Sequence, residues 1–527
     1  MNILIAGLRR FEVGRCRAAL FSASAIAAAL FFAVAPVRAA SCESLASLSL
    51  PDTTITKAEL VPAGSFTPPP PVGPPPPIGA EPIDWAHLPA FCRVTATLKP
   101  TSDSDIRIEV WLPVSGWNGK YEGVGNGGWA GSISYPEMNH ALRDGYATSS
   151  TDTGHEGGAA AGSFALGHPE KVVDYAYRSE HEMTVKAKAI VAAFYGKPPQ
   201  FSYWNGCSTG GKQALTEAQR YPKDYNGIIA GAPANYMIHL HVRQVAIWEF
   251  AHRTPEAMIP PAKYPMIHAA VMSECDALDG LKDGLIENPR ACRFDPKTIE
   301  CKEGDQPSCL TSAQVETARA IYAPTRIPST GQVVFPGLEP GSEPAWGLLI
   351  GGKGALIAPD TFKYIVFKDA NWDASKLNLD KDVAYADKVD GGLNNAIDPN
   401  LKPFFSHGGK LIIYHGWSDQ LISPGNTLDY YASVLKTVGA PAKQDMRLFM
   451  VPGMEHCRGG EGPNVFDMMP AISQWAEGGK PPAEVIATHK TKGAVDRTRP
   501  LCPYPQIAKY KGTGSIDEAA NFVCAAK

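Results

Sequence analysis

Alternating apolar and polar positions along the chain predict a sheet whose strands are separated by helices. Residues 107–112 alternate with the period of two that is typical of a strand, and residues 146–150 are the next strand-like segment. Residues 180–195 are amphipathic with a helical period and lead into the aromatic, strand-like residues 201–204. The helix-forming residues 212–219 come next. Strands that alternate with helices indicate an α/β fold with a parallel sheet and right-handed crossovers.

This regular pattern is interrupted in the middle of the chain. Residues 227–231 still form a buried strand, but residues 235–400 hold helical pieces, four cysteines and many prolines and glycines. The strand pattern resumes at residues 409–414 and again at residues 446–451. We therefore predict an α/β core with a large inserted lid. The core consists of residues 41–234 and 401–527, and the lid consists of residues 235–400.

The first forty residues have the pattern of a targeting signal. Several arginines precede the apolar run 18–35, and small residues for cleavage follow at positions 37–40. A membrane anchor is the alternative, since the apolar run approaches the length that spans a bilayer. We predict a signal peptide at residues 1–40 with cleavage near Ala40. The mature protein would then be secreted or periplasmic and not membrane-bound.

The charge balance of the chain is ordinary, and its cysteine count indicates an oxidising compartment. A net charge of −4 with 19% charged residues gives no indication of a nucleic-acid partner. The proline-rich residues 68–77 form a polyproline II stretch that cannot join a sheet, and we expect a surface loop there. Ten cysteines follow the predicted signal peptide, and none forms a C-x-x-C pair. An even number without that spacing favours five disulfides over metal binding.

Residues 206–210, Gly-Cys-Ser-Thr-Gly, match the G-x-S-x-G pattern of a nucleophile elbow. The pattern lies between a predicted strand and a predicted helix, where such an elbow turns sharply. Ser208 would present its hydroxyl at a helix N-terminus, whose dipole favours a developing negative charge. Because 50 of the 527 residues are glycine, the pattern also arises by chance, and the prediction depends on a matching acid and histidine.

An acid and a histidine follow later in the chain, each just after a predicted strand. Asp419 follows the strand 409–414, and His456 follows the strand 446–451. In α/β-hydrolases the order is Ser, Asp, His; the histidine takes the proton of the serine, and the carboxylate orients the histidine. We therefore predict Ser208, Asp419 and His456 as the catalytic residues, and an α/β-hydrolase fold for the core that carries the inserted lid. The alternative bases are His415 and His155.

A glycine-rich loop upstream of the serine is suited to binding an oxyanion. Residues 121–131 end a strand in Gly-Asn-Gly-Gly at positions 125–128, where lipases carry a related motif that begins with histidine. The alternative is a merely flexible loop. We predict that the N–H of Thr209, together with that of Gly127 or Gly128, binds the oxyanion.

Residues 275–285 concentrate carboxylates in a short segment of the predicted lid. Asp276, Asp279 and Asp283 fall within eight positions, and glycines between them allow tight turns. Oxygen ligands at this density suit Ca²⁺, although the segment does not follow the EF-hand pattern. An acidic surface turn is the alternative.

The arrangement Cys207-Ser208, Asp419 and His456-Cys457 resembles the tannase and feruloyl esterase family of secreted α/β-hydrolases. If Ser208 and His456 touch, the neighbouring cysteines come close enough to form a disulfide. The resemblance covers essentially the whole mature chain. It implies a structural Ca²⁺ held by Asp276, Asp279 and Asp283 with the carbonyls of Leu281 and Leu285. The remaining cysteines are expected to pair with sequence neighbours, which also matches the resemblance, as Cys42–Cys92, Cys275–Cys292, Cys301–Cys309 and Cys502–Cys524.

These observations predict a secreted serine carboxylesterase that acts on small aromatic esters, free or attached to a plant polysaccharide. The resemblance implies feruloyl esters first, gallate esters second and terephthalate monoesters third. A calcium-stabilised binding module without catalytic activity is the alternative from another class. The sequence does not decide among the acyl groups, because the residues that set specificity lie in the lid.

Overall fold

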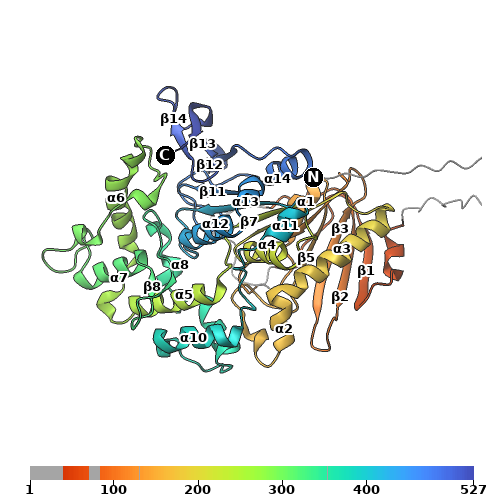
Figure 1. The fold of residues 1–527 in the computed structure, drawn as a ribbon, viewed down its shortest axis with the longest axis horizontal. Helices are drawn as coiled ribbons and strands as arrows, with labels where there is room; N and C mark the ends of the chain where they lie inside the picture. Colours follow the sequence, from red (N-terminus) through yellow and green to blue (C-terminus); the bar gives the residue numbers. More distant parts are fainter. Residues whose placement is uncertain (1–39, 71–82, 130, 353, 527) are drawn as a thin grey trace, which may run out of the picture. The chain divides into compact units, whose positions relative to one another are not determined.

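Nine strands form one mixed sheet in the computed structural model, which describes residues 40–70, 83–129, 131–352 and 354–526 (Figure 1). The strand order is β1-β2-β3-β5-β4-β6-β7-β10-β11. The predicted signal peptide, apart from Ala40, and most of residues 68–77 lie outside the described residues. The strands are β1 Thr53–Val61, β2 Phe91–Leu98, β3 Ile106–Pro113, β4 Lys120–Val124, β5 Ala147–Thr151, β6 Phe201–Cys207, β7 Gly227–Gly231, β10 Lys410–Gly416 and β11 Met446–Val451.

The sheet is parallel over most of its width and antiparallel at one edge. The strands β5, β4, β6, β7, β10 and β11 run parallel, as predicted. The strands β1, β2 and β3 pair antiparallel, and β3 also pairs antiparallel with β5. The prediction of a parallel sheet is wrong for this edge. Only residues 99–105 join β2 to β3, and a parallel pair needs a much longer crossover.

The central strands are buried on both faces, which explains their nearly continuous apolar sequence. In β10, Leu411 and Ile413 belong to one hydrophobic cluster, whereas Ile412 belongs to the cluster on the opposite face. In β7, Ile228 and Ile229 divide in the same way. Parallel strands covered by helices on both faces require this pattern.

Helices connect the parallel strands, and two of them confirm the predicted helices. Residues 180–195 lie in α3 and residues 212–219 lie in α4. Met183, Ala187 and Ile190 recur at helical spacing on the buried side of α3 and join the core cluster of the sheet. The helices of this part are α1 Tyr135–Arg143, α2 Pro169–Val173, α3 Ser179–Tyr195, α4 Thr209–Arg220, α11 Lys402–Ser406, α12 Pro424–Val438, α13 Ala440–Asp445 and α14 Met469–Gly478.

The long segment between β7 and β10, called the lid below, is mostly helical and is coloured green to cyan in Figure 1. Its ends lie side by side, because the N–H of Ala396 donates to the carbonyl of Asn235 at 2.7 Å. The lid does not separate from the core, since Ala39–Lys527 pack as one compact unit. Its exact boundaries stay a prediction. Its elements are α5 Met237–Ala251, α6 Tyr264–Cys275, α7 Ser312–Tyr322, α8 Gly347–Ile350, α9 Ala358–Asp360, α10 Leu379–Asp390 and the hairpin β8 Thr325–Arg326 with β9 Val333–Phe335.

The C-terminal residues form two hairpins outside the main sheet. The first pairs β12 Val485–Thr491 with β13 Ala494–Leu501, and the second pairs β14 Ile507–Tyr510 with β15 Phe522–Ala525. The sequence places these residues in the core and predicts no separate sheets for them. Short polar-rich strands near a chain end give no signal of which sheet they join.

Five disulfides join the predicted pairs of cysteines, Cys42–Cys92, Cys207–Cys457, Cys275–Cys292, Cys301–Cys309 and Cys502–Cys524. Disulfides persist in oxidising compartments. Among the described residues, no helix combines the length and the apolar character needed to cross a bilayer.

Candidate active site

Ser208 occupies the sharp turn between β6 and α4. Its φ of 65° lies in the left-handed region, which non-glycine residues adopt rarely and mostly at functional turns. The N–H of Ser208 donates to the carbonyl of Gly231 at 2.9 Å, which ties the turn to β7. A Cβ on Gly206 would lie 2.7 Å from the carbonyl carbon of Gly210, so the turn requires glycine at position 206. A Cβ on Gly210 would lie 3.0 Å from the carbonyl oxygen of Asn126, which is also a tight contact. Residues 206–210 thus have the geometry of a nucleophile elbow.

A chain of hydrogen bonds joins Ser208, His456 and Asp419. His456 Nε2 lies 2.9 Å from Ser208 Oγ, and His456 Nδ1 lies 2.7 Å from Asp419 Oδ2. Asp419 follows β10 and His456 follows β11, and the ends of neighbouring parallel strands meet at one edge of the sheet. The structure therefore brings together the three side chains that the sequence predicts. Their spacing is that of a nucleophile, a base and an orienting carboxylate.

Asp419 is held as a carboxylate despite complete burial. Its Oδ1 accepts hydrogen bonds from the N–H groups of Leu421 and Ile422, each at 2.8 Å. Burial would raise the pKa of Asp419, but the neighbouring imidazoles of His456 and His415 hold that pKa well below its ordinary value. Asp419 is thus ionised throughout the neutral range and can stabilise a positive charge on His456.

His415 supports the acid, and the structure does not place it as a base. Its Nε2 lies 3.1 Å from Asp419 Oδ2 and 3.0 Å from the carbonyl of Ile422, while its Nδ1 lies 2.7 Å from Thr427 Oγ1. Two acceptors at Nε2 place a proton on that nitrogen. From the sequence, His415 is predicted only as an alternative base. Its role beside Asp419 could have been inferred from the four-residue spacing at the end of a strand.

The other rival base, His155, is also engaged away from the serine. Its Nε2 lies 2.6 Å from the carbonyl of Trp129, and its ring stacks on Phe164 with centroids 3.6 Å apart. Burial lowers the pKa of His155 to about 4, so the ring is neutral. The first contact ties the segment after β5 to the loop that follows β4, and the second ties it to the short helical turn Ser163–Ala165.

The predicted oxyanion donors lie beside the elbow. The N–H of Gly210 donates to the carbonyl of Asn126 at 2.7 Å, which docks the glycine-rich loop on α4. The carbonyl of Gly128 accepts from Thr209 Oγ1 at 2.8 Å and from the hydroxyl of Tyr175 at 2.9 Å. The N–H groups of Gly127, Gly128 and Thr209 donate to no acceptor within the described residues. Amide groups without a protein partner at such a site are available to a developing oxyanion.

Two further contacts hold His456 in place. The Cys207–Cys457 disulfide joins the immediate neighbours of Ser208 and His456 across a sequence separation of 250 residues. The side-chain carbonyl of Gln420 accepts from the N–H of His456 at 3.2 Å. Sequence reasoning missed Gln420, since no residue pattern marks an amide that bonds to a backbone group.

The predicted calcium ligands lie in one loop enclosed by the Cys275–Cys292 disulfide. Asp276 Oδ1 accepts from the N–H groups of Asp283 and Gly284, both at 3.1 Å. Asp283 Oδ2 also accepts from Arg499 at 2.7 Å. Within the described part of the chain, no group of three or more His, Cys, Asp or Glu side chains is arranged to hold a metal.

The backbone and the charges of this loop nevertheless fit an oxygen-bound cation. The carbonyls of Leu281 and Leu285 accept no hydrogen bond from any described residue. Burial raises the pKa of Asp279, and the nearby charges of Asp283 and Asp276 raise it further. A cation would relieve that repulsion and satisfy the carbonyls.

Comparison with known proteins gives a family and a fold. Residues 92–525 match the family model described as tannase and feruloyl esterase. An uncharacterized esterase from Xanthomonas campestris pv. campestris is 38% identical, and the match covers 92% of this chain and 91% of that protein. The crystal structure of feruloyl esterase B from Aspergillus oryzae superposes with a TM-score of 0.84 at 30% identity, covering 92% of this chain and 99% of that one. Tannin acyl hydrolase from Aspergillus niger has a TM-score of 0.75 at 21% identity, covering 91% and 93%, and supports the fold alone.

Proposed function

Because the chain belongs to the tannase and feruloyl esterase family, and is thus a carboxylic ester hydrolase, we propose that it cleaves feruloyl esters through an acyl-enzyme on Ser208. The observation that carries this proposal is the continuous hydrogen-bond chain from Ser208 through His456 to Asp419. Gallate esters, and after them terephthalate monoesters, are the alternative substrates.

In the proposed reaction, Ser208 Oγ attacks the ester carbonyl while His456 Nε2 takes its proton. The carbonyl oxygen becomes an oxyanion, which the N–H groups of Thr209 and of Gly127 or Gly128 stabilise. The carbon–oxygen bond to the alcohol then breaks, and the alcohol leaves with the proton from His456. Water, deprotonated by His456, attacks the carbonyl of the acyl-enzyme. The bond between the acyl carbon and Ser208 Oγ breaks, His456 returns the proton to Oγ, and the acid is released. Asp419 orients His456 and stabilises its charged form in both steps.

A panel of esters tests the proposed preference. We expect kcat/KM for methyl ferulate to exceed that for propyl gallate and for a terephthalate monoester by at least about tenfold, because binding pockets discriminate ring substituents to that degree or more. Ferulate is expected to be the preferred acyl group because the chain is 30% identical to feruloyl esterase B over 92% of its length. Methyl caffeate, which lacks one methyl group, should fall between these values. A preference for the gallate ester would identify a tannase. Ligand binding without turnover of any ester would support the non-catalytic alternative.

We further propose that the loop 276–285 binds a structural Ca²⁺ through Asp276, Asp279 and Asp283 with the carbonyls of Leu281 and Leu285. The support is the pair of carbonyls without hydrogen-bond donors and the mutual repulsion of the carboxylates. The ion would supply positive charge that offsets this repulsion and would hold the loop against Arg499, which contacts Asp283. Its role is structural, and no reaction step passes through it.

Thermal melts test the calcium proposal without reference to activity. A ligand at 100 times its Kd stabilises the native state by about 2.7 kcal/mol. Added Ca²⁺ should therefore raise the Tm of the wild-type protein above its value in chelator, whereas Asp279→Ala should melt at one temperature in both. Asp373→Ala serves as the control, since that carboxylate caps a turn elsewhere in the lid. Equal wild-type melting temperatures with Ca²⁺ and with chelator would refute the proposal.

We also propose that the protein is exported and meets esters of plant polysaccharides outside the cytoplasm. Five disulfides and the basic and apolar pattern of the first forty residues support export. The N-terminus of the mature protein should lie near Ser41. An intact N-terminus in a cytoplasmic fraction would contradict export.

A further inference from the structure

His456 lies near the tip of a loop that folds back on itself between residues 453 and 462. Met454 and Gly460 form an antiparallel bridge at its base. Gly459 and Gly460 have φ values of 75° and 91°, which only glycine adopts without strain. Within the loop, the N–H of Glu455 donates to the carbonyl of Gly459 at 3.1 Å and the N–H of Gly462 donates to the carbonyl of Gly453 at 3.2 Å. These bonds set the shape of the loop, whereas its position relative to Ser208 depends on contacts with other parts of the protein.

On the core side, those contacts include the Cys207–Cys457 disulfide, the side chain of Gln420 and the N–H of Ser418, which donates to the carbonyl of Met454 at 3.0 Å. On the lid side, an ion pair joins Glu461, on the returning limb of the loop, to His268 of α6. His268 Nε2 lies 2.8 Å from Glu461 Oε2. Its other nitrogen, Nδ1, lies 2.7 Å from Glu343 Oε2, within the lid.

The two contacts require His268 to be charged. A carboxylate can only accept a hydrogen bond, so a ring with a carboxylate at each nitrogen must carry both protons. Burial lowers the pKa of His268, but the hydrogen bonds and charges of Glu343 and Glu461 outweigh burial and raise the pKa to about 9. At neutral pH the imidazolium thus joins two negative side chains from different parts of the fold.

The two carboxylates that bind His268 differ in how firmly they are held by the rest of the protein. Glu343 is fully buried, and its Oε1 accepts from the hydroxyl of Tyr322 at 2.6 Å and from the N–H of Gly341 at 2.7 Å. The side chain of Glu461 is 58% exposed and bonds to no other residue within the described chain. His268 is therefore anchored inside the lid through Nδ1, and its Nε2 binds Glu461 on the loop that carries His456.

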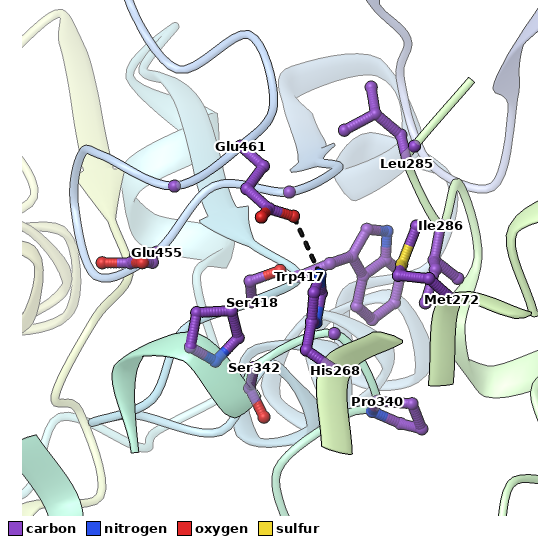
Figure 2. Close-up of a pocket in the computed structure, with 15 residues that line it drawn as sticks. His268, Met272, Leu285, Ile286, Pro340, Ser342, Trp417, Ser418, Glu455 and Glu461 are labelled. Carbon is purple, nitrogen blue, oxygen red and sulfur yellow. Dashed lines mark hydrogen bonds and ion pairs between the residues drawn. The ribbon is translucent and has the colours of Figure 1, made fainter. Parts of the chain in front are cut away.

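The same place is where the lid meets the loops of the acid and the base. Figure 2 shows His268 and Glu461 joined, with Ser418 and Glu455 drawn nearby. These four residues line a cavity of about 20 Å³. Ser418 immediately precedes Asp419, and Glu455 immediately precedes His456. A cavity of that size holds about one water molecule, so the segments around it are closely packed.

We propose that His268 is a positioning residue of the lid, which holds the loop of His456 in register with Ser208 through its ion pair with Glu461. Docking of the lid and placement of the base are thereby coupled. This inference rests on the proposed esterase function, because the loop it concerns carries the proposed base. His268 acts through the loop and does not touch the ester.

Removal of either charge tests the coupling. Glu461→Gln and His268→Gln should each lower kcat about tenfold, because small displacements of a catalytic group lower the rate steeply while the binding surface is unchanged. KM for the preferred ester should stay within about twofold. The double variant should be no slower than the single variants, since both remove one interaction. Additive losses, or wild-type kcat in either variant, would overturn the proposal.

A pH profile separates positioning from a general loss of structure. The pKa of His268 lies above its ordinary value of 6.5, so the ion pair is complete below about pH 6.5 and is lost as the pH rises through about 9. Wild-type kcat, corrected for uncatalysed hydrolysis, should fall across that alkaline range. Glu461→Gln should lack this fall, and an unchanged fall would contradict the role. The other titratable groups that face the pair are Tyr322, Glu455 and His489.

A control variant and melting temperatures distinguish failure of the positioning role from failure of the proposed esterase function. His87→Gln removes an exposed histidine that pairs with Asp84 at 2.8 Å, and it should leave kcat and the pH profile unchanged. Melting temperatures of the single and double variants at pH 7 and pH 10 measure the ion pair without any ester. At pH 7 we expect the effects of Glu461→Gln and His268→Gln on the melting temperature to be non-additive, and at pH 10 we expect them to be additive. Additive effects at pH 7 would show that the ion pair does not form. A wild-type protein that hydrolyses no ester would overturn the proposed function as well as the positioning role.

Discussion

Ser208→Ala is expected to lower kcat for ester hydrolysis by about 10⁶ and to leave the protein folded. The hydroxyl supplies the atom that attacks the carbonyl, and no other described side chain is placed to replace it at His456 Nε2. The backbone φ of 65° at this position is as accessible to alanine as to serine, so the elbow should keep its shape. Initial rates on methyl ferulate and the melting temperature measure the two parts of this prediction.

Ser433→Ala is the matched control for the loss of a hydroxyl. Ser433 lies on α12, and its hydroxyl donates to the carbonyl of Tyr430 within that helix at 2.6 Å. The control should retain wild-type kcat. Folded Ser208→Ala with more than a small fraction of wild-type activity would show that another residue is the nucleophile.

Asp419→Asn is expected to lower kcat by about 10⁴, the loss seen when serine hydrolases carry an amide in place of the orienting acid. The N–H groups of Leu421 and Ile422 both donate to Oδ1, so the amide oxygen should occupy that position and the amide nitrogen should face His456. An amide N–H cannot accept a hydrogen bond from Nδ1–H. His456 would then carry its proton on Nε2, where it could not receive one from Ser208.

Asp224→Asn is the matched control for this second variant. Asp224 Oδ2 lies 2.6 Å from His181 Nδ1, so the substitution alters another aspartate–histidine pair and should leave kcat unchanged. A loss of less than tenfold in Asp419→Asn would show that Asp419 does not orient the base. A large and equal loss in both variants would indicate a general effect on folding.

The regular parts of the fold could be predicted because each signal is local. Strands β6, β7, β10 and β11 have short apolar runs bounded by glycine or proline, and the elbow pentapeptide fixes a strand, a turn and a helix within a few residues. Asp419 and His456 could then be identified because α/β-hydrolases carry the serine, the acid and the histidine in that order, each after a strand of the parallel sheet. Disulfides between cysteines that are neighbours in the sequence could be predicted for the same reason, because each closes a local loop.

The parts that escaped prediction depend on contacts between residues far apart in the chain. Which strands pair at the β1–β3 edge and in the C-terminal hairpins depends on which sheet edges are left unpaired. No local sequence pattern indicates those edges. Gln420 acts through its side-chain carbonyl on a backbone N–H. His268 and Glu461 are separated by 193 residues and lie in segments with no motif of their own. Only the folded arrangement makes them a pair.

Mass spectrometry of an acid-quenched reaction tests the central claim most directly, because the proposed mechanism requires an ester bond between substrate and serine. After mixing with an activated ester of ferulic acid, the wild-type protein should gain the mass of one feruloyl group. Peptide mapping should locate that group on Ser208, and Ser208→Ala should gain none. A feruloyl group on any other residue, or the same label in Ser208→Ala, would contradict the proposed acyl-enzyme.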